Sequence, residues 1–230
     1  MKPYRRYAIY YTPPPGPFAD FGAAWLGWDA DRGRDCERPA SVGPDMGAIT
    51  DVPRRYGFHA TLKPPFRLAA GADAGMLRDA VAAMADDLCA VTLPGLELSR
   101  IGPFLALVPQ GDVPALTTLA GEVVRRADAW RAPASADEIA RRNPDQLDTR
   151  GRMLLARWGY PWVMERFRFH MTLSGPLDAA TAARAEAVLA PMLAVVPRPF
   201  CVDALSLAGE DDQGRFHVLS RFSLRAPPRP

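Results

Sequence analysis

Two short segments of the sequence contain nearly the same residues in the same order. The segment Phe-His-Ala-Thr-Leu-Lys-Pro-Pro at 58–65 aligns without a gap with Phe-His-Met-Thr-Leu-Ser-Gly-Pro at 169–176. The chain has three histidines, and two of them, His59 and His170, occupy the same position in the two copies. A duplicated His-x-Thr motif with matching neighbours indicates two histidines that act together.

Alternation along a strand predicts which of these side chains lie on a shared surface. Residues two apart on a strand project from the same face. His59 and Thr61 then point one way, and the phenylalanine and leucine around them point into a core. The second copy places His170 and Thr172 in the same relation. A pseudo-twofold between the copies would make the two imidazoles face each other across a groove.

Two imidazoles and two hydroxyls are suited to phosphoryl chemistry at a diester. An imidazole with an ordinary pKa near 6.5 can serve as base or acid close to neutral pH. One histidine would deprotonate the attacking water or hydroxyl, and the other would protonate the departing alkoxide. Threonine hydroxyls can donate to the non-bridging oxygens, where charge accumulates. We therefore predict four catalytic residues, His59, Thr61, His170 and Thr172, which need neither a metal nor a cofactor.

The motifs also resemble a known group of proteins. The matched His-x-Thr pair, with Arg-Tyr-Ala-Ile-Tyr at 6–10 and Arg-Tyr-Gly-Phe-His-Ala-Thr-Leu-Lys at 55–63, is similar to the two-histidine phosphoesterase superfamily. Within it, these segments resemble the branch encoded with carbon–phosphorus lyase genes. The resemblance implies a duplicated bilobal α+β fold, with two antiparallel sheets flanked by helices around a central groove. It also implies a role in phosphonate utilisation, with a ribose-type cyclic phosphate as substrate.

The elements that must position the motifs follow from hydrophobic periodicity and from proline and glycine. Strands are expected at 4–12, 57–62, 96–99, 103–108, 166–173, 201–207 and 215–224, and helices at 18–28, 73–89, 113–130 and 178–193. A capping box at 135–138 begins one of two further helices in the connection between the copies. The chain is expected to form one bilobal domain over 1–230, with halves at 1–110 and 111–230. The segment 29–54 is expected to be an irregular loop that borders the groove.

Strand parity extends the predicted site outward. Arg55 and Lys63 have the parity of His59, Arg168 has that of His170, and these cations are candidates for binding further phosphate. Tyr10 is a candidate for holding a base or sugar, although alternation alone does not show which tyrosine of the first strand faces the groove. The arginines at 125–126 and 141–142 are interpreted as solvated helix faces.

Composition limits the classes of protein to which the chain can belong. The formal net charge of +2 does not fit a protein that coats nucleic acid. No apolar run is long enough for a signal peptide or a membrane helix, so a cytoplasmic protein without a membrane partner is expected. The three cysteines are far apart and form no CxxC pair, which indicates reduced thiols. Composition leaves the oligomeric state open.

Three rival readings remain for the motifs. A metal site built from His59, His170 and His217 is disfavoured because no HxxxH or HxH spacing occurs. An RNA with a 2′,3′-cyclic end is the main alternative to a small cyclic phosphate, although a nucleic-acid end is not the favoured partner. A binding module that keeps the groove without chemistry is the third, and two intact motifs argue against it.

Overall fold

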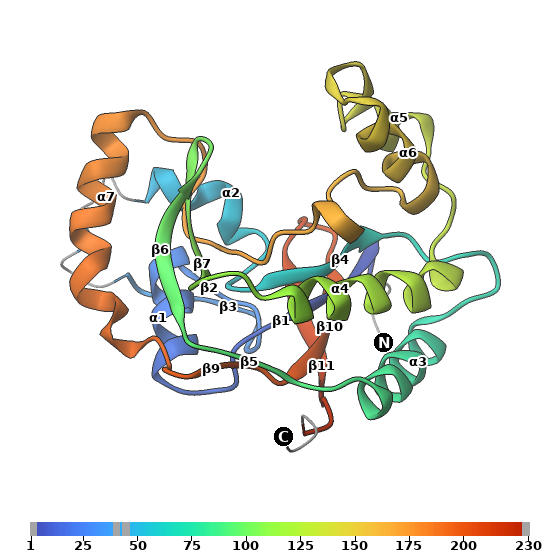
Figure 1. The fold of residues 1–230 in the computed structure, drawn as a ribbon, viewed down its shortest axis with the longest axis horizontal. Helices are drawn as coiled ribbons and strands as arrows, with labels where there is room; N and C mark the ends of the chain where they lie inside the picture. The colour runs from blue at the N-terminus through green and yellow to red at the C-terminus, as the bar shows by residue number, and fades with distance from the viewer. Residues whose placement is uncertain (1–3, 39–41, 43–46, 227–230) are drawn as a thin grey trace.

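A single antiparallel sheet of seven strands runs through the centre of the molecule (Figure 1). The computed structural model describes residues 4–38, 42 and 47–226. In the order in which they lie side by side, the strands are β11 (Phe216–Ser223), β10 (Ala204–Glu210), β1 (Arg6–Tyr11), β4 (Ala60–Phe66), β8 (Met171–Thr172), β7 (Phe104–Pro109) and β6 (Leu96–Ile101). Two small two-stranded sheets join β2 (Trp28–Asp29) to β3 (Arg34–Asp35) and β5 (Val91–Leu93) to β9 (Phe200–Val202).

The α+β class is confirmed, but the expected pair of separate sheets is wrong. The two motif strands, β4 and β8, pair directly through Ala60 and Met171, and this contact joins both copies into one sheet. The two halves of the sequence are also interleaved. The strand β8 lies beside β7, which pairs with β6, and both of these come from before residue 110; β4 lies on the side of the C-terminal strands β10 and β11.

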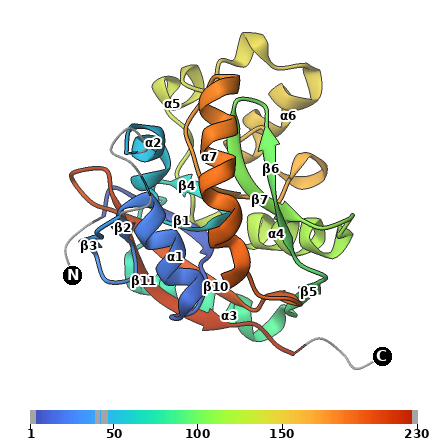
Figure 2. The same ribbon diagram turned by 90° about the vertical axis from the view of Figure 1, so that its left-hand side faces the viewer.

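Helices cover one face of the sheet. The α-helices are α1 (Pro17–Leu26), α2 (Asp51–Arg54), α3 (Ala74–Asp87), α4 (Pro114–Ala127), α5 (Ala136–Ala140), α6 (Thr149–Trp158) and α7 (Ala179–Met192). Ile9 of β1 and Leu107 of β7 share a continuous apolar core with Leu77 of α3, Val123 of α4 and Leu189 of α7. Figure 2 shows this layer with α7 and α1 in front of the sheet. No helix in the described part of the chain is long and apolar enough to cross a membrane.

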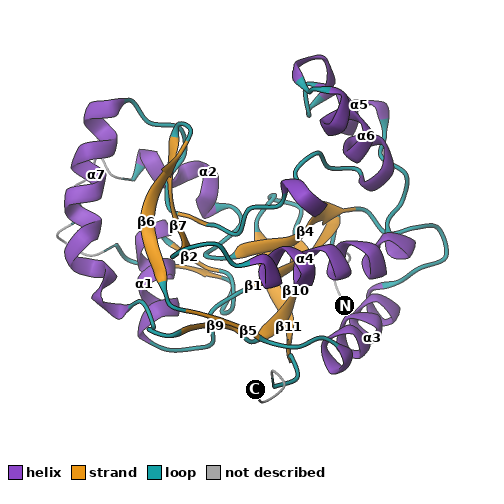
Figure 3. Ribbon diagram, in the orientation of Figure 1, coloured by secondary structure: helices purple, strands orange, loops and turns teal. Residues whose placement is uncertain are grey.

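The helix ends follow the local sequence. Asp73, Asp148 and Asp178 each accept a backbone N–H in the first turn of the helix that they precede. The predicted capping box is confirmed, because Ser135 and Glu138 each accept the backbone N–H of the other at the start of α5. In the upper right of Figure 3, α5 and α6 form a helical projection.

The segment at 29–54 is more ordered than the expected loop. Within its described residues are the β2–β3 hairpin, the 3-10 turn Ala48–Thr50 and the short helix α2. The Ile49 carbonyl accepts the N–H of Gly175, just after the second motif, at 2.6 Å. The described end of this segment therefore lies against the second motif, and α2 leads directly toward the first. Positions 39–41 and 43–46 lie outside the described residues.

The second motif strand is shorter than expected. Only Met171 and Thr172 form β8; of the predicted strand, Arg166 ends a 3-10 turn and residues 167–170 belong to no helix or strand. The first motif strand also begins later than expected, at Ala60, and continues through Pro64 and Pro65. The prolines are tolerated because β8 pairs with β4 only at Ala60, so they interrupt no hydrogen bonds on that side.

Candidate active site

The pairing of β4 with β8 brings the two motifs onto one face of the sheet. Ala60 lies opposite Met171 in an antiparallel pair. Continuing this register by one residue on each side places His59 opposite Thr172 and Thr61 opposite His170. The two histidines are then diagonal neighbours, about 7–8 Å apart at the backbone and within reach of one small group between them. All four side chains are half-buried. The structure therefore brings together the four residues that the sequence singled out.

The apolar residues of the motifs lie on the opposite side, as alternation predicts. Phe58, Leu62, Phe169 and Leu173 are buried in the main core. The indole of Trp25 on α1 donates a hydrogen bond to the Leu173 carbonyl at 2.7 Å, which fixes α1 to the second motif.

Two glycines are needed to seat the first motif. Gly57 has a φ of +72°, a backbone conformation that side-chain-bearing residues rarely adopt. Its carbonyl is the acceptor that orients His59. Gly22 on α1 lies against the ring of Phe58, and a Cβ at this position would come within 1.9 Å of that ring. A larger residue at either site would displace the strand that carries His59.

A hydrogen bond to the backbone carbonyl two residues earlier holds both imidazoles in the same tautomer. The Nδ1–H of His59 donates to the Gly57 carbonyl at 2.9 Å, and the Nδ1–H of His170 donates to the Arg168 carbonyl at 2.8 Å. A carbonyl only accepts, so the proton must lie on Nδ1, and Nε2 is left as the unprotonated, basic nitrogen of each neutral ring. The Thr61 hydroxyl donates to Nε2 of His59 at 3.1 Å.

Burial favours the neutral form of both rings. It lowers the pKa of His59 to about 4; the hydrogen bond to Gly57 opposes this shift, and the neighbouring His170 adds to it. Burial also lowers the pKa of His170, against a hydrogen bond to Arg168 that raises it.

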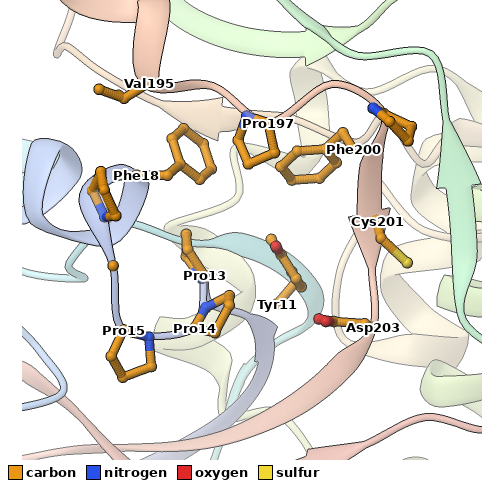
Figure 4. A pocket seen from close by; sticks show the side chains of 13 residues that line it. Tyr11, Pro13, Pro14, Pro15, Phe18, Val195, Pro197, Phe200, Cys201 and Asp203 are labelled. Carbon is orange, nitrogen blue, oxygen red and sulfur yellow. The ribbon is translucent and has the colours of Figure 1, made fainter.

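Tyr10 is the tyrosine of the first strand that reaches the histidines. It pairs with Thr61 across β1 and β4, and its ring centroid lies 3.8 Å from that of His59. The ring is only 1% exposed, and its hydroxyl has no hydrogen-bond partner among the described residues. Tyr10 therefore packs against a catalytic candidate and is almost closed to solvent. Tyr11 points to the opposite face, where it lines a cavity rich in proline (Figure 4).

Lys63 is not on the groove face, contrary to the prediction from strand parity. The register between β1 and β4 shifts between Ile9 and Tyr10, so that Lys63 pairs with Ile9 of the core. A bulge of this kind reverses the alternation that parity assumes. The side chain is 1% exposed, and its ammonium group donates to Asp128 at 3.1 Å and to the Val124 carbonyl at 3.4 Å.

Substitution of Lys63 is therefore expected to affect stability. Lys63→Met keeps most of the aliphatic stem but removes the buried ammonium group that pairs with Asp128. This change should lower the free energy of unfolding by about 1–3 kcal/mol. Asp128 retains Arg131 at 2.9 Å, which limits the loss. Urea unfolding of this variant, beside Arg78→Met on the exposed side of α3, measures the effect. A Lys63→Met protein of full stability whose KM is raised would restore the binding role.

The predicted cations Arg55 and Arg168 are both exposed, but they lie in different places. Arg55 follows α2 in a turn and not on the strand, so its strand parity does not apply. It lines a basic cavity on the β1 side of the histidines. Arg168 lines a cavity of about 420 Å³ on the other side, with Ser99 and Val108 of the β6–β7 hairpin. The first cavity also contains Tyr56, close to His59, and the second contains Phe169, next to His170 in the chain.

The third histidine is not part of this site. His217 lies on β11, three strands from β4, and bonds Asp211 at 2.7 Å. Across the described residues, no group of three or more histidine, cysteine, aspartate or glutamate side chains is placed to hold a metal ion.

Comparison with known proteins assigns the chain to a family. Residues 61–217 match the family described as "Protein of unknown function (DUF1045)", and the chain belongs to this family. It is 36% identical over 229 residues to a protein of Janthinobacterium sp. (strain Marseille) named ribose 1,5-bisphosphate phosphokinase PhnN, with 91% of this chain and 48% of the relative covered. A protein of the same name from Laribacter hongkongensis (strain HLHK9) is 34% identical over 174 residues, which cover 75% of this chain and 40% of the relative.

The chain thus spans about half the length or less of these curated relatives. Among solved structures, it is similar to E. coli LigT complexed with 3′-AMP, at 15% identity and a TM-score of 0.46, with 95% of this chain and 97% of that chain covered. LigT complexed with phosphate gives 13% identity and a TM-score of 0.47, with 96% and 98% covered. The family match and the relatives named PhnN confirm the resemblance to the carbon–phosphorus lyase branch that the two motifs indicated.

Proposed function

We propose that this chain is a metal-independent phosphodiesterase that opens a small cyclic phosphate by acid–base catalysis with His59 and His170. The observation that carries the proposal is the register of β4 against β8, which sets two His-x-Thr pairs on one face of the sheet. Both rings are oriented through Nδ1, so that both Nε2 atoms are available for proton transfer. An acid, a base and two hydroxyl donors are then supplied by four side chains.

In the proposed reaction, Nε2 of His59 takes a proton from a water molecule as the water oxygen forms a bond to phosphorus. The bond from phosphorus to one ring oxygen breaks, and the Nε2–H of a protonated His170 donates its proton to that oxygen. The products are a phosphate monoester and a free hydroxyl. We assign the base to His59 because its pKa, near 4, keeps it unprotonated at neutral pH. Thr172 donates to one non-bridging oxygen, and the Thr61 hydroxyl turns from Nε2 of His59 to the other when the water molecule takes its place at Nε2.

The substrate class that we propose is a ribose-type cyclic phosphate used in phosphonate metabolism. The PhnN name of the relatives, which includes a ribose bisphosphate, supports this class. We do not propose the kinase activity in that name. The phosphate-binding loop of many kinases needs a GxxxxGK[ST] segment, and this chain has only Lys2 and Lys63, neither in such a segment.

The experiment that tests the proposal is a panel of substrates. Ribose cyclic phosphates, nucleoside 2′,3′-cyclic phosphates, nucleoside 3′,5′-cyclic phosphates and RNA with a 2′,3′-cyclic end should be incubated with the protein after chelation with EDTA. Turnover of a small cyclic phosphate supports the proposal. Preference for the RNA end would assign the alternative substrate. Tight binding without turnover of any member would assign a phosphate-binding module.

The lowered pKa values predict an acid-shifted pH profile. The reactive form has His59 neutral, which holds above a pH of about 4, and His170 protonated, which holds only below its own lowered pKa. The optimum of kcat/KM, which reports the free enzyme, should therefore lie below the ordinary imidazole value of about 6.5. Rates between pH 4 and 9 measure this. An optimum above pH 7 would contradict the assignment of both rings.

A further inference from the structure

A strongly basic cavity lies on the β1 side of the histidine pair. Its volume is about 680 Å³, within the range of small-ligand sites. Its walls come from β1 and the residue before it, from the turn after α2, from the end of β4, and from the connection around α5. The arginines that line it are Arg5, Arg6, Arg55, Arg67, Arg131, Arg141 and Arg142, and the carboxylates are Glu138 and Glu210.

Part of this charge is neutralised within the protein. Arg6 donates twice to Glu210, at 2.5 and 2.6 Å, and Arg67 donates twice to Glu138, at 3.1 and 3.0 Å. Arg131 is paired with Asp128 at 2.9 Å. These three arginines form part of the cavity wall, and their carboxylate partners largely neutralise their positive charge.

Four other arginines remain available to a ligand. Within the described part of the chain, Arg5, Arg55, Arg141 and Arg142 have no carboxylate within ion-pair distance. Arg142 is half-buried, and its guanidinium lies 4.6 Å from the centre of the Tyr160 ring. Stacking on an aromatic ring orients a guanidinium while leaving its edge free to donate. Unpaired guanidinium groups around one cavity are the arrangement that binds phosphate.

The cavity is joined to the histidines by Tyr56. This residue lines the cavity, and its ring centroid lies 6.1 Å from that of His59. Arg55, one of the arginines without a carboxylate partner, precedes Tyr56 in the chain and lines the same cavity. A ligand that touches both the histidines and the arginines would therefore need two anionic groups, one at each end.

We propose that this arginine cavity binds a second phosphate group of the substrate, so that the preferred substrate is a small cyclic phosphodiester with a terminal phosphomonoester. The inference rests on the function proposed above and narrows its substrate class. The terminal phosphate accepts hydrogen bonds from the four unpaired arginines, while the cyclic phosphate lies between His59 and His170. Each charge-assisted hydrogen bond typically contributes about 1.5–3 kcal/mol, which is roughly a 10- to 100-fold effect.

The test compares two substrates that differ only in the terminal phosphate. Adenosine 2′,3′-cyclic phosphate with a 5′-phosphate should be hydrolysed with a kcat/KM at least about 10-fold above that of the same compound without it. Arg142→Gln, and separately Arg55→Gln, should reduce this preference by about 10-fold. Arg78→Gln, on the exposed side of α3, should leave the preference unchanged and serves as the matched control.

The outcomes separate this inference from the function on which it rests. Equal rates on the two compounds would overturn the second-phosphate site and leave the phosphodiesterase intact. A strong preference for a 2′,3′-cyclic RNA end over the 5′-phosphorylated compound would overturn it in favour of an RNA backbone.

Failure to hydrolyse either compound would overturn the proposed function. Calorimetry with adenosine 5′-monophosphate then tests whether the arginine cavity binds a phosphate group, independently of turnover. Binding to the wild type that is about 10-fold weaker in Arg142→Gln, but not in Arg78→Gln, supports an arginine site for phosphate. Absence of binding, or equal binding by the two variants, overturns it.

Discussion

Alanine in place of His59 or His170 is expected to lower kcat on the cyclic phosphate by about 10²–10⁴. Each substitution removes one proton transfer, either from the attacking water or to the departing oxygen. Both rings are half-buried at the surface of the sheet face, so circular dichroism should show an intact fold. Steady-state kinetics on the confirmed substrate provides the measurement.

The two histidine substitutions should not be additive. When one proton transfer is lost, the other can no longer be concerted with it, and the double variant should lose far less than the product of the single losses. His217→Gln is the matched control, because this histidine pairs with Asp211 three strands away. Near wild-type turnover in either single variant would disprove the pairing of His59 with His170.

Valine in place of Thr61 or Thr172 is expected to slow turnover by several-fold to about 10³. The substitution nearly preserves volume and removes the hydroxyl that would donate to a non-bridging oxygen. Thr61 should show the larger effect, because its hydroxyl also bonds Nε2 of His59 at 3.1 Å. The free energy of unfolding should change little, since water is an alternative partner for a half-exposed hydroxyl.

Serine variants at the same two positions provide the control for the hydroxyl. Thr61→Ser and Thr172→Ser keep the donor and lose only a methyl group, so they should retain most of the activity that valine removes. Valine variants as active as the serine variants would show that the hydroxyls take no part in the reaction.

The sequence was sufficient to predict the central residues of the site. His59 and His170 are recognisable because each motif is repeated with its apolar neighbours, and strand alternation then assigns the residues at 58–62 and 169–173 to the correct face. The buried positions of Phe58 and Phe169 agree with that assignment. The long helices were also predictable, because each presents an apolar stripe and three of them begin next to an aspartate or a proline.

Other features depend on contacts that no local pattern encodes. The bulge that turns Lys63 into the core arises from the pairing of β1 with β4, and parity cannot detect a shift of register. The union of the two copies in one sheet depends on the single pair of Ala60 with Met171. Helix periodicity predicted that Arg141 and Arg142 lie on solvated helix faces. In the folded chain, these two residues line the arginine cavity.

The arginine cavity illustrates how distant segments form a site. Its lining residues come from segments spread along the chain between Arg5 and Glu210. No single sequence motif spans these segments. One signal was present in the sequence: all but two of the 28 basic residues are arginine. Arginine is the side chain suited to bidentate recognition of phosphate, although composition alone does not show where such residues gather.

The most direct test of the central claim is a phosphorus NMR measurement on the chelated protein in ¹⁸O-labelled water. With EDTA present, the wild type should convert a ribose-type cyclic phosphate to a monoester that has gained one ¹⁸O, and His59→Ala and His170→Ala should leave the cyclic phosphate unchanged over the same period. Conversion only after addition of a divalent ion, or equal conversion by wild type and both variants, would contradict catalysis by the histidine pair.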